Sequence, residues 1–218
     1  MGLTDTVNWR RISLNDKFYN LPKEKQNFII NAGYRVFSEN SYKKSPMSEI
    51  AREAGISKSL LFHYFKNKKE FYLYLYNNVF SLMREIAVEE MIDSKTDFFD
   101  GFLMSLKYQR KLVEQHVHSF RFIMKTFYEE DEEVAGDLTQ KNSAQSNDGI
   151  RILLSVTDKS KFKEGVEIEQ LINIITWCLE GFWKEKFCIP NLDMDEVYVG
   201  YEKIIDFFRK SFYKEEYL

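Results

Sequence analysis

One short segment, beginning at Ser45, constrains what this chain can fold into more than any other part of the sequence. Ser45 suits the cap of a helix, and Pro46 suits its first position, where a missing backbone N–H costs nothing. Gly55 tolerates the left-handed conformation that ends such a helix, and Ser57 suits the cap of a second helix at residues 58–65. Two short helices joined by a tight turn form a helix-turn-helix, a motif whose second helix enters the major groove of DNA.

The two expected helices have matching apolar faces. In the first, Ile50, Ala51 and Ala54 lie at helical spacing. In the second, Leu61 and Phe65 do so, and the small Ala51 lets the helices cross closely. The pattern therefore predicts DNA binding. A helical hairpin without a DNA role is the alternative, because many such hairpins carry a glycine in the turn.

Four stretches in and around this segment form a recognisable pattern. They are residues 29–37, 41–42, 50–58 and 61–69. Together they resemble the tetracycline-repressor (TetR) family of bacterial regulators, over about a quarter of the chain, roughly residues 23–75. The resemblance implies an all-α fold, with an N-terminal three-helix DNA-binding domain that carries the helix-turn-helix. It also implies a C-terminal helical domain that binds a ligand and dimerises.

The chain departs from the family pattern at four positions. Gly33 stands where alanine is usual, Ser41 replaces a glycine, and Pro46 replaces a threonine or serine. Phe62 stands where tyrosine is more usual, so a hydroxyl that could reach a phosphate is missing. None of these departures changes the expected fold, and the last alters one DNA contact.

The second helix of the motif and its flanks supply the candidate DNA contacts. Lys58 can meet a phosphate or a guanine edge, and Leu60 can contact a thymine methyl group. Lys68 begins the next helix, where its charge and the helix-end N–H groups both favour phosphate. The resemblance implies a phosphate contact for the Tyr64 hydroxyl, although Tyr64 and His63 can instead pack against their neighbours. The complete candidate set is Ser45, Lys58, Ser59, Leu60, Phe62, His63, Tyr64 and Lys68.

The charge of the chain is divided unevenly along its length. Residues 1–70 contain 13 Lys and Arg against 7 Asp and Glu, whereas the remainder contains 18 against 27. A basic segment followed by an acidic one indicates a molecule in which one part meets phosphates. The overall net charge of −3 does not argue against DNA binding, because the electrostatic field near the binding surface determines the attraction to DNA.

Apolar residues recur at three- and four-residue intervals through the rest of the chain, and few glycines and prolines interrupt them. Besides the motif, helices are expected at residues 23–39, 68–91, 98–113, 116–128, 130–156, 166–187 and 193–213. The expected organisation is an N-terminal extension at residues 1–22, a helix-turn-helix domain at 23–67, and an effector-binding and dimerisation domain at 68–218.

The family resemblance implies a pocket for a small-molecule effector among the helices of the second domain. Large aromatic residues are candidates for its lining, although aromatic residues at helical spacing equally fill cores. The candidates are Phe102, Tyr108, Phe120, Phe127 and Trp177.

Wide apolar stripes on the last two helices suggest a dimer. The resemblance implies that these helices pair with their copies as a four-helix bundle about a two-fold axis. The alternative is that the stripes only close the core of one chain. The candidate interface residues are Ile175, Leu179, Phe182, Trp183, Ile204, Ile205, Phe208 and Phe212.

Several function classes find no support in the sequence. It contains no glycine-rich phosphate loop, nucleophile elbow or zinc-protease motif, so neither an enzyme nor a cofactor is expected. His116 and His118 would point to different sides of a helix, so no metal site is expected.

No apolar stretch reaches the length of about 18 residues needed to cross a membrane. Residues 1–11 lack the apolar core of a secretory signal, so a cytoplasmic protein without a membrane partner is expected.

These observations predict a ligand-responsive transcriptional regulator that acts as a homodimer on double-stranded DNA. Its simplest form is a repressor that a small hydrophobic effector releases from a palindromic operator. An activator or a ligand-independent regulator is one alternative, and a helical enzyme or adaptor is another. The sequence names neither the effector, the operator, the target genes nor the role of residues 1–22.

Overall fold

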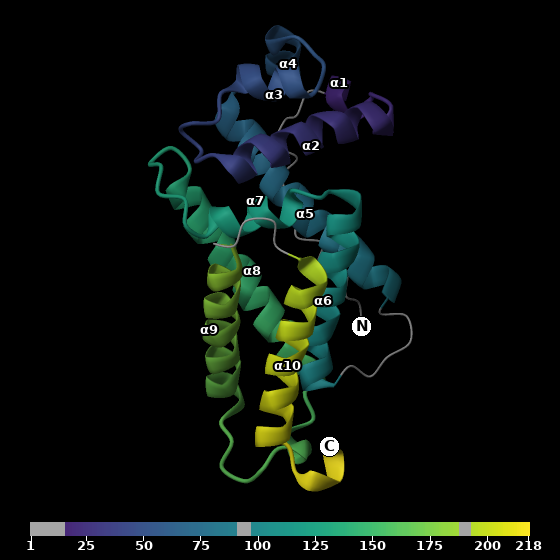
Figure 1. Cartoon of the computed structure of the whole chain (residues 1–218), viewed down its shortest axis with the longest axis vertical. Coiled ribbons are helices and arrows are strands. Elements are labelled where there is room, and N and C mark those ends of the chain that lie inside the picture. The colour runs from purple at the N-terminus through teal and green to yellow at the C-terminus, as the bar shows by residue number, and fades with distance from the viewer. Residues whose placement is uncertain (1–15, 91–96, 188–192) are drawn as a thin grey trace. The chain divides into compact units, whose positions relative to one another are not determined.

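The computed structural model describes residues 16–90, 97–187 and 193–218 and consists mainly of helices (Figure 1). Within these ranges the backbone forms no strand, only one isolated bridge between Phe162 and Tyr213, so the predicted all-α fold is confirmed. None of the described helices combines the length and apolar character that crossing a membrane requires. The helices are α1 Asp16–Tyr19, α2 Lys23–Glu39, α3 Met47–Glu53, α4 Lys58–Tyr64, α5 Lys68–Glu90, α6 Phe98–Gln115, α7 Ser119–Thr126, α8 Ala135–Val156, α9 Ile168–Phe187 and α10 Met194–Phe212.

Most helix limits fall close to the predicted residues, but the start of α8 does not. The sequence predicts a helix from residue 130, whereas α8 begins at Ala135. Glu129 Oε1 accepts a hydrogen bond from the N–H of Asp131 at 3.2 Å, and Asp131 Oδ1 accepts one from the N–H of Glu133 at 3.1 Å. The acidic run forms a loop because its carboxylates bond the local backbone, which competes with helix formation.

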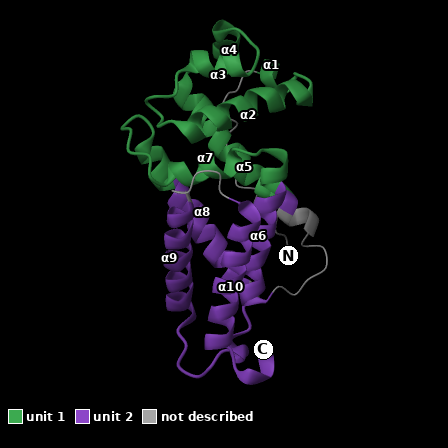
Figure 2. Cartoon of the chain, viewed as in Figure 1, with its two compact units in different colours: residues 1–85, 112–140 green, residues 86–111, 141–218 purple. Residues whose placement is uncertain are grey.

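The described residues pack into two compact units (Figure 2). The first unit contains α1 to α4, most of α5, the end of α6, α7 and the start of α8, within residues 1–85 and 112–140. The second contains the remaining parts of α5, α6 and α8 together with α9 and α10, within residues 86–111 and 141–218. This division describes packing, and the functional boundary between residues 67 and 68 stays a prediction.

Aromatic rings fill the core of the first unit. Phe37 of α2 stands edge-on to Tyr72 of α5 with ring centroids 4.7 Å apart, and Tyr72 stands edge-on to Phe122 of α7 at 5.1 Å. All three rings are buried, and such pairs add to the energy of burial alone. The buried hydroxyl of Tyr34 donates to the Leu75 carbonyl at 3.2 Å, so α2 and α5 are also joined by a polar contact.

Gly33 lets α2 approach α5 closely. A Cβ atom at this position would lie 2.6 Å from Cδ1 of Leu75 and 2.7 Å from Cζ of Phe71. Both neighbours are fully buried core side chains, so they have little room to retreat. The glycine that stands in place of the family's usual alanine is explained by this contact.

A polar network in the second unit centres on Asp97, just before α6. Its Oδ2 accepts hydrogen bonds from Nζ of Lys161 at 2.7 Å and from the hydroxyl of Tyr213 at 2.9 Å, and its Oδ1 accepts one from the N–H of Phe99 at 3.1 Å. Burial raises the pKa of the Asp97 carboxyl, but these hydrogen bonds outweigh burial and leave that pKa below its usual value. The network therefore ties the start of α6 to the segments that precede α9 and follow α10.

We expect Asp97→Asn to lower the free energy of unfolding by about 1–3 kcal/mol at pH 7, because the amide replaces a charged acceptor of three hydrogen bonds. A carboxylate with a depressed pKa stabilises the folded state above its unfolded pKa of about 3.9, and this contribution is lost as the pH falls through the folded pKa. The difference between wild type and variant should therefore shrink in acid. Urea unfolding followed by circular dichroism at several pH values measures it. The exposed Asp206→Asn is the matched control, and equal losses in the two variants at pH 7 would contradict the prediction.

Candidate nucleic-acid interface

The turn of the helix-turn-helix is built around Gly55, as the sequence predicts. Gly55 has a φ of +66°, in the left-handed region that favours a residue without Cβ. Its N–H donates to the Arg52 carbonyl at 3.2 Å, and the N–H of Ile56 donates to the Ala51 carbonyl at 3.0 Å. This pair of hydrogen bonds is a Schellman motif, and it sets the direction in which the chain leaves α3.

Ser57 caps the recognition helix α4, also as predicted. Its Oγ accepts a hydrogen bond from the N–H of Leu60 at 3.1 Å. Leu61 is fully buried where α4 packs on α3, and Ile50 and Ala51 of α3 are buried too. One side of α4 is thus held in the core while the opposite side stays at the surface.

The outward side of α4 carries Lys58, Ser59, Phe62 and His63, all of them exposed. Phe62 retains 39% of its surface, and Nζ of Lys58 lies 5.8 Å from the centroid of its ring. Leu60 is half-buried. A cation, a hydroxyl, an imidazole and an apolar ring therefore share one side of a short helix, and such groups are the ones that read base edges and phosphates in a major groove.

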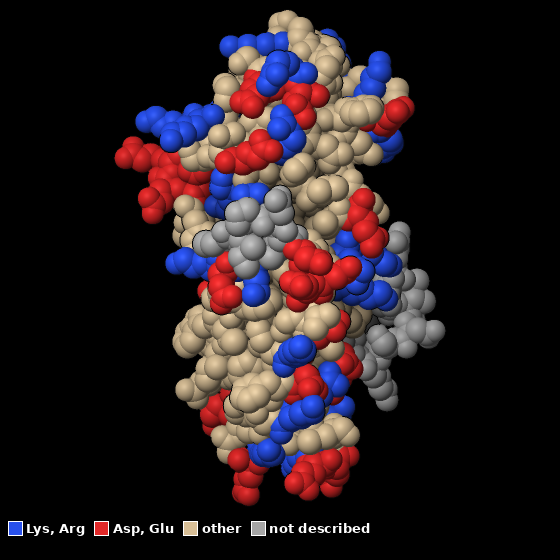
Figure 3. Space-filling model, viewed as in Figure 1, with Lys and Arg blue, Asp and Glu red and all other residues tan. Residues whose placement is uncertain are grey.

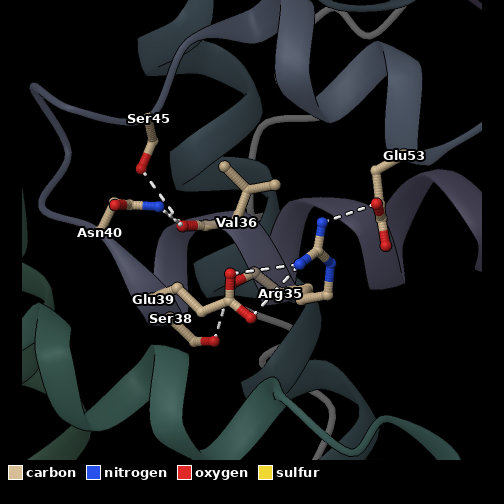
Figure 4. Close-up of polar contacts among 7 residues, drawn as sticks. All are labelled: Arg35, Val36, Ser38, Glu39, Asn40, Ser45 and Glu53. Carbon is tan, nitrogen blue, oxygen red and sulfur yellow. Dashed lines mark hydrogen bonds and ion pairs between the residues drawn. The ribbon is translucent and has the colours of Figure 1, made fainter.

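Arg35 of α2 ties α2 to the helix-turn-helix. Its Nη2 donates to Oε2 of Glu53 at the end of α3 at 2.6 Å, and its Nη1 donates to the carboxylate of Glu39 at 3.2 Å (Figure 4). A guanidinium shared by carboxylates of two helices restricts the angle between them. Sequence reasoning missed this residue. The spacing of Arg35 and Glu39 is a visible signal, but Glu53 lies 18 residues away and becomes a partner only in the fold.

Ser45 does not take its predicted role. Pro46 occupies the N-cap position of α3, and Ser45 is fully buried. The N–H of Ser45 donates to the Tyr42 carbonyl at 3.2 Å, and its hydroxyl lies 2.9 Å from the Ser41 carbonyl. The same hydroxyl lies 3.3 Å from the Val36 carbonyl (Figure 4). Because both donors are used inside the protein, the predicted phosphate contact of Ser45 is wrong.

Tyr64 packs against the N-terminal extension. It is 7% exposed, and its ring stands edge-on to that of Phe18 in α1 with centroids 5.8 Å apart. Phe18 is fully buried and also contacts the rings of Phe65 and Tyr74. The packing alternative for Tyr64 is therefore favoured, and α1 belongs to the same compact unit as the helix-turn-helix. Residues 1–15 of the extension lie outside the described residues.

Lys68 faces other protein groups. Its Nζ lies 4.3 Å from the centroid of the Tyr42 ring and 3.4 Å from the Lys43 carbonyl. Burial lowers the pKa of this amine, while the carboxylates of the run at residues 129–133 act in the opposite direction. Asn67 caps the start of α5, since its Oδ1 accepts a hydrogen bond from an N–H in the first turn at 2.8 Å. The predicted phosphate contact of Lys68 thus has a competitor within the same unit.

Basic and acidic side chains adjoin one another over the first unit on the face drawn in Figure 3, so this face is not uniformly positive. Exposed lysines nevertheless flank both helices of the motif, at Lys43, Lys44, Lys58 and Lys66. Exposed cations attract a duplex of any sequence through its phosphates, and this attraction weakens as salt is added.

Among the described residues, no group of three or more His, Cys, Asp or Glu side chains is placed so that it could hold a metal ion. His116 is buried, and its Nδ1 lies 2.7 Å from Oδ1 of Asn31 in α2. Burial lowers the pKa of both His116 and His118, which favours their neutral imidazoles. The buried histidine serves as a hydrogen-bond partner of α2.

The five candidates for an effector pocket are divided between the two units. Phe102, Tyr108 and Trp177 belong to the second unit, and Phe120 and Phe127 belong to the first. Trp177 is 66% exposed and Phe127 is 49% exposed, so these two do not line a buried interior of the single chain, and their assignment stays a prediction. Tyr108 and Phe120 are buried, and Phe102 is partly buried.

Most of the predicted dimer residues are used inside one chain. The five that are at most 7% exposed are Ile175, Leu179, Trp183, Ile205 and Phe208. Phe182, Ile204 and Phe212 are partly buried. Because α9 and α10 pack against each other, these side chains fill the core of the second unit and have almost no surface left for a partner. The predicted seam stays a prediction, and within one chain its five buried residues already serve the core.

Comparison with known proteins identifies the N-terminal part of the chain. Residues 29–75 match the model of the tetR family of bacterial regulatory proteins. The fatty acid metabolism regulator protein of Bacillus subtilis is 33% identical over 75 residues, which are 34% of this chain and 38% of that protein. The negative transcriptional regulator IcaR of the biofilm operon icaADBC in Staphylococcus aureus is 23% identical over 168 residues, or 73% of this chain and 85% of that protein.

Solved structures show the same fold over nearly the whole chain. A TetR-family transcriptional regulator from Chloroflexus aurantiacus superposes with a TM-score of 0.65 at 16% identity, covering 93% of this chain and 99% of that one. The regulator FadR from Bacillus subtilis, in complex with stearoyl-CoA, gives a TM-score of 0.57 at 17% identity, covering 83% and 96%. The matched residues 29–75 contain the Gly55 turn and the recognition helix. Residues 29–75 are therefore similar to the DNA-binding segment of the tetR family of bacterial regulatory proteins, and the chain shares its fold with TetR-family transcriptional regulators.

Proposed function

We propose that this chain is a cytoplasmic repressor that binds a near-palindromic operator as a homodimer and is released by a small hydrophobic effector. The observation that carries the proposal is the exposed side of α4, held at a defined angle by the Gly55 turn and the pairing of Arg35 with Glu53. The negative regulation named for IcaR supports the repressor role. An activator with the same interface is the alternative.

Base and phosphate contacts are assigned to the exposed residues of α4. Lys58 approaches a phosphate or a guanine edge, and Ser59 and His63 offer polar groups to bases or backbone. Phe62, which carries no hydroxyl, offers an apolar face suited to a thymine methyl group. The half-buried Leu60 supplements this apolar contact.

We expect Lys58→Ala to weaken operator binding about tenfold and to make its salt dependence shallower, because one charged contact to DNA is lost. The helical content should not change, since Lys58 is exposed. The operator is first selected from a random duplex library, and affinity is then measured by fluorescence anisotropy at several salt concentrations. Lys159→Ala, an exposed lysine of the second unit, is the matched control. An unchanged affinity of Lys58→Ala would remove this residue from the interface.

A different set of residues from those predicted supplies the dimer interface in our proposal. Ile174 and Trp177 lie one turn apart on α9 and are 40% and 66% exposed, and Val199 and Phe207 of α10 are 48% and 65% exposed. Each pair leaves an apolar surface on a helix whose opposite side is already packed. A second copy of the chain is the occupant that fits, because a two-fold dimer also places two recognition helices on successive half-sites.

We expect Trp177→Glu to convert a dimer to a monomer at micromolar concentration, because it places a charge within the apolar interface. Specific operator binding should be lost while the fold is retained, since Trp177 is exposed. Sedimentation velocity gives the oligomeric state. Ile152→Glu changes a 53% exposed apolar residue on α8 and should leave the dimer intact. A monomeric wild type would overturn both the dimer and the palindromic operator.

The effector is proposed to be a long-chain acyl compound. The support is that FadR, which shares the fold, was solved in complex with stearoyl-CoA, and that buried aromatic residues such as Tyr108 and Phe120 occur in helices of this chain. An apolar chain is the class of ligand that aromatic interiors favour.

We expect stearoyl-CoA to raise the melting temperature by several degrees and to release DNA, because a ligand at 100 times its Kd adds about 2.7 kcal/mol to the stability of the folded state. Acetyl-CoA, which has the same head group without the long chain, should do neither. Differential scanning fluorimetry and DNA anisotropy measure the two effects. The absence of stabilisation by any long-chain acyl-CoA or fatty acid would refute this effector class and leave the DNA-binding role unaffected.

A further inference from the structure

The connection between α7 and α8 carries the acidic run at residues 129–133, and it lies beside the loop that leads into α3 (Figure 1). Oε2 of Glu129 accepts a hydrogen bond from the backbone N–H of Tyr42 at 2.8 Å. At the end of α7, Nζ of Lys125 donates to the Asn40 carbonyl at 3.0 Å. These contacts join segments 87 and 85 residues apart, so tertiary structure places the acidic run next to the helix-turn-helix.

The same connection surrounds the two lysines that begin α5. Nζ of Lys69 lies 2.6 Å from Oδ2 of Asp137, the third residue of α8. Lys68 lies over the Tyr42 ring, and the carboxylates of residues 129–133 are near enough to raise its pKa against the larger effect of burial. The ammonium group of Lys69 therefore pairs with a carboxylate of its own chain, and that of Lys68 contacts an aromatic ring and a backbone carbonyl beside the acidic run.

Lys68 and Lys69 follow the recognition helix closely in sequence, and phosphate is the partner expected for Lys68 from the sequence. An ammonium group that donates to a carboxylate has fewer donors and less field left for a phosphate. A lysine that is already paired also contributes less to the release of counterions from DNA.

We propose that the acidic connection, residues 129–137, is an intramolecular competitor of DNA. Asp137 pairs with Lys69, while Lys68 is held against the Tyr42 ring and the Lys43 carbonyl beside the acidic run, and DNA must displace these contacts to gain two backbone contacts. The inference rests on the DNA-binding function proposed above and adds a regulatory contact to it. Any rearrangement of the α7–α8 connection then changes DNA affinity without altering the recognition helix.

A purely structural role for the acidic connection predicts a different effect on DNA affinity from a competing role. If the connection only orders the loop before α3, weakening it should leave DNA affinity unchanged or reduce it. Glu129 bonds the backbone and is left intact for this reason. Asp131, Glu133 and Asp137 carry the competing charge, and the amides of Asn and Gln preserve their size and hydrogen-bond acceptors.

The test measures binding of wild type and D131N/E133Q/D137N to a fluorescein-labelled duplex of about 30 base pairs and arbitrary sequence, because phosphate contacts do not depend on sequence. The variant should bind roughly three- to tenfold more tightly at low salt, and its log–log salt slope should steepen by roughly 1–2, since each added phosphate contact contributes about 0.9. The control E164Q/E215Q/E216Q removes the same charge from exposed positions of the second unit and should change the slope little.

A double-mutant cycle separates local pairing from net charge. D137N alone should tighten binding roughly two- to fivefold, the range for an exposed ion pair, and this gain should vanish in a K69Q background. Should the triple variant fail to fold, D137N carries the test, because the ion pair it removes is partly exposed.

A wild type that binds no duplex at any salt concentration refutes the proposed function. A wild type that binds, with variants of equal or weaker affinity, refutes the competitor alone.

Discussion

The direction of the recognition helix depends on one backbone constraint, the left-handed conformation of Gly55. At a φ of +66° a side chain would be strained, and the two hydrogen bonds that end α3 form only when the chain turns in this way. Once the turn is made, Leu61 enters the core and the opposite side of α4, with Lys58, faces outward. Arg35 then holds α3 to α2 through Glu53, so the interface is presented by a rigid frame.

Pairing of charges within the first unit limits how much of its basic character reaches DNA. The N-terminal 70 residues have a clear excess of lysine and arginine, yet Lys69 is paired with Asp137 and Lys68 lies among carboxylates. The exposed lysines of the motif and the two lysines that begin α5, Lys68 and Lys69, therefore have different roles. The lysines of the motif attract a duplex of any sequence. In our proposal, Lys68 and Lys69 contact DNA only when the acidic connection no longer occupies them. Affinity in such a protein is set by the connection as well as by the recognition helix.

Helical periodicity identifies an apolar stripe but not the surface that covers it. Ile175 and Trp177 of α9 are two residues apart, and both are large and apolar. In the structure Ile175 is fully buried while Trp177 is 66% exposed, because α10 packs on one side of α9 only. The stripe that is strongest in the sequence is the one that closes the unit's own core. The weaker stripe that remains at the surface is the one open to a second copy.

The sequence by itself determined the features that depend on interactions within a few residues. The limits of α2, the Gly55 turn and the Ser57 cap follow from backbone preferences and neighbouring hydrogen bonds, and the structure reproduces them. Only the tertiary structure decided which side chains remain available for DNA, a ligand or a partner. Burial is a property of segments far apart in the chain: Tyr64 is covered by α1, and Lys68 lies among carboxylates more than 60 residues away. A local pattern therefore specifies how a side chain leaves the backbone, but the packing of distant helices determines what it meets.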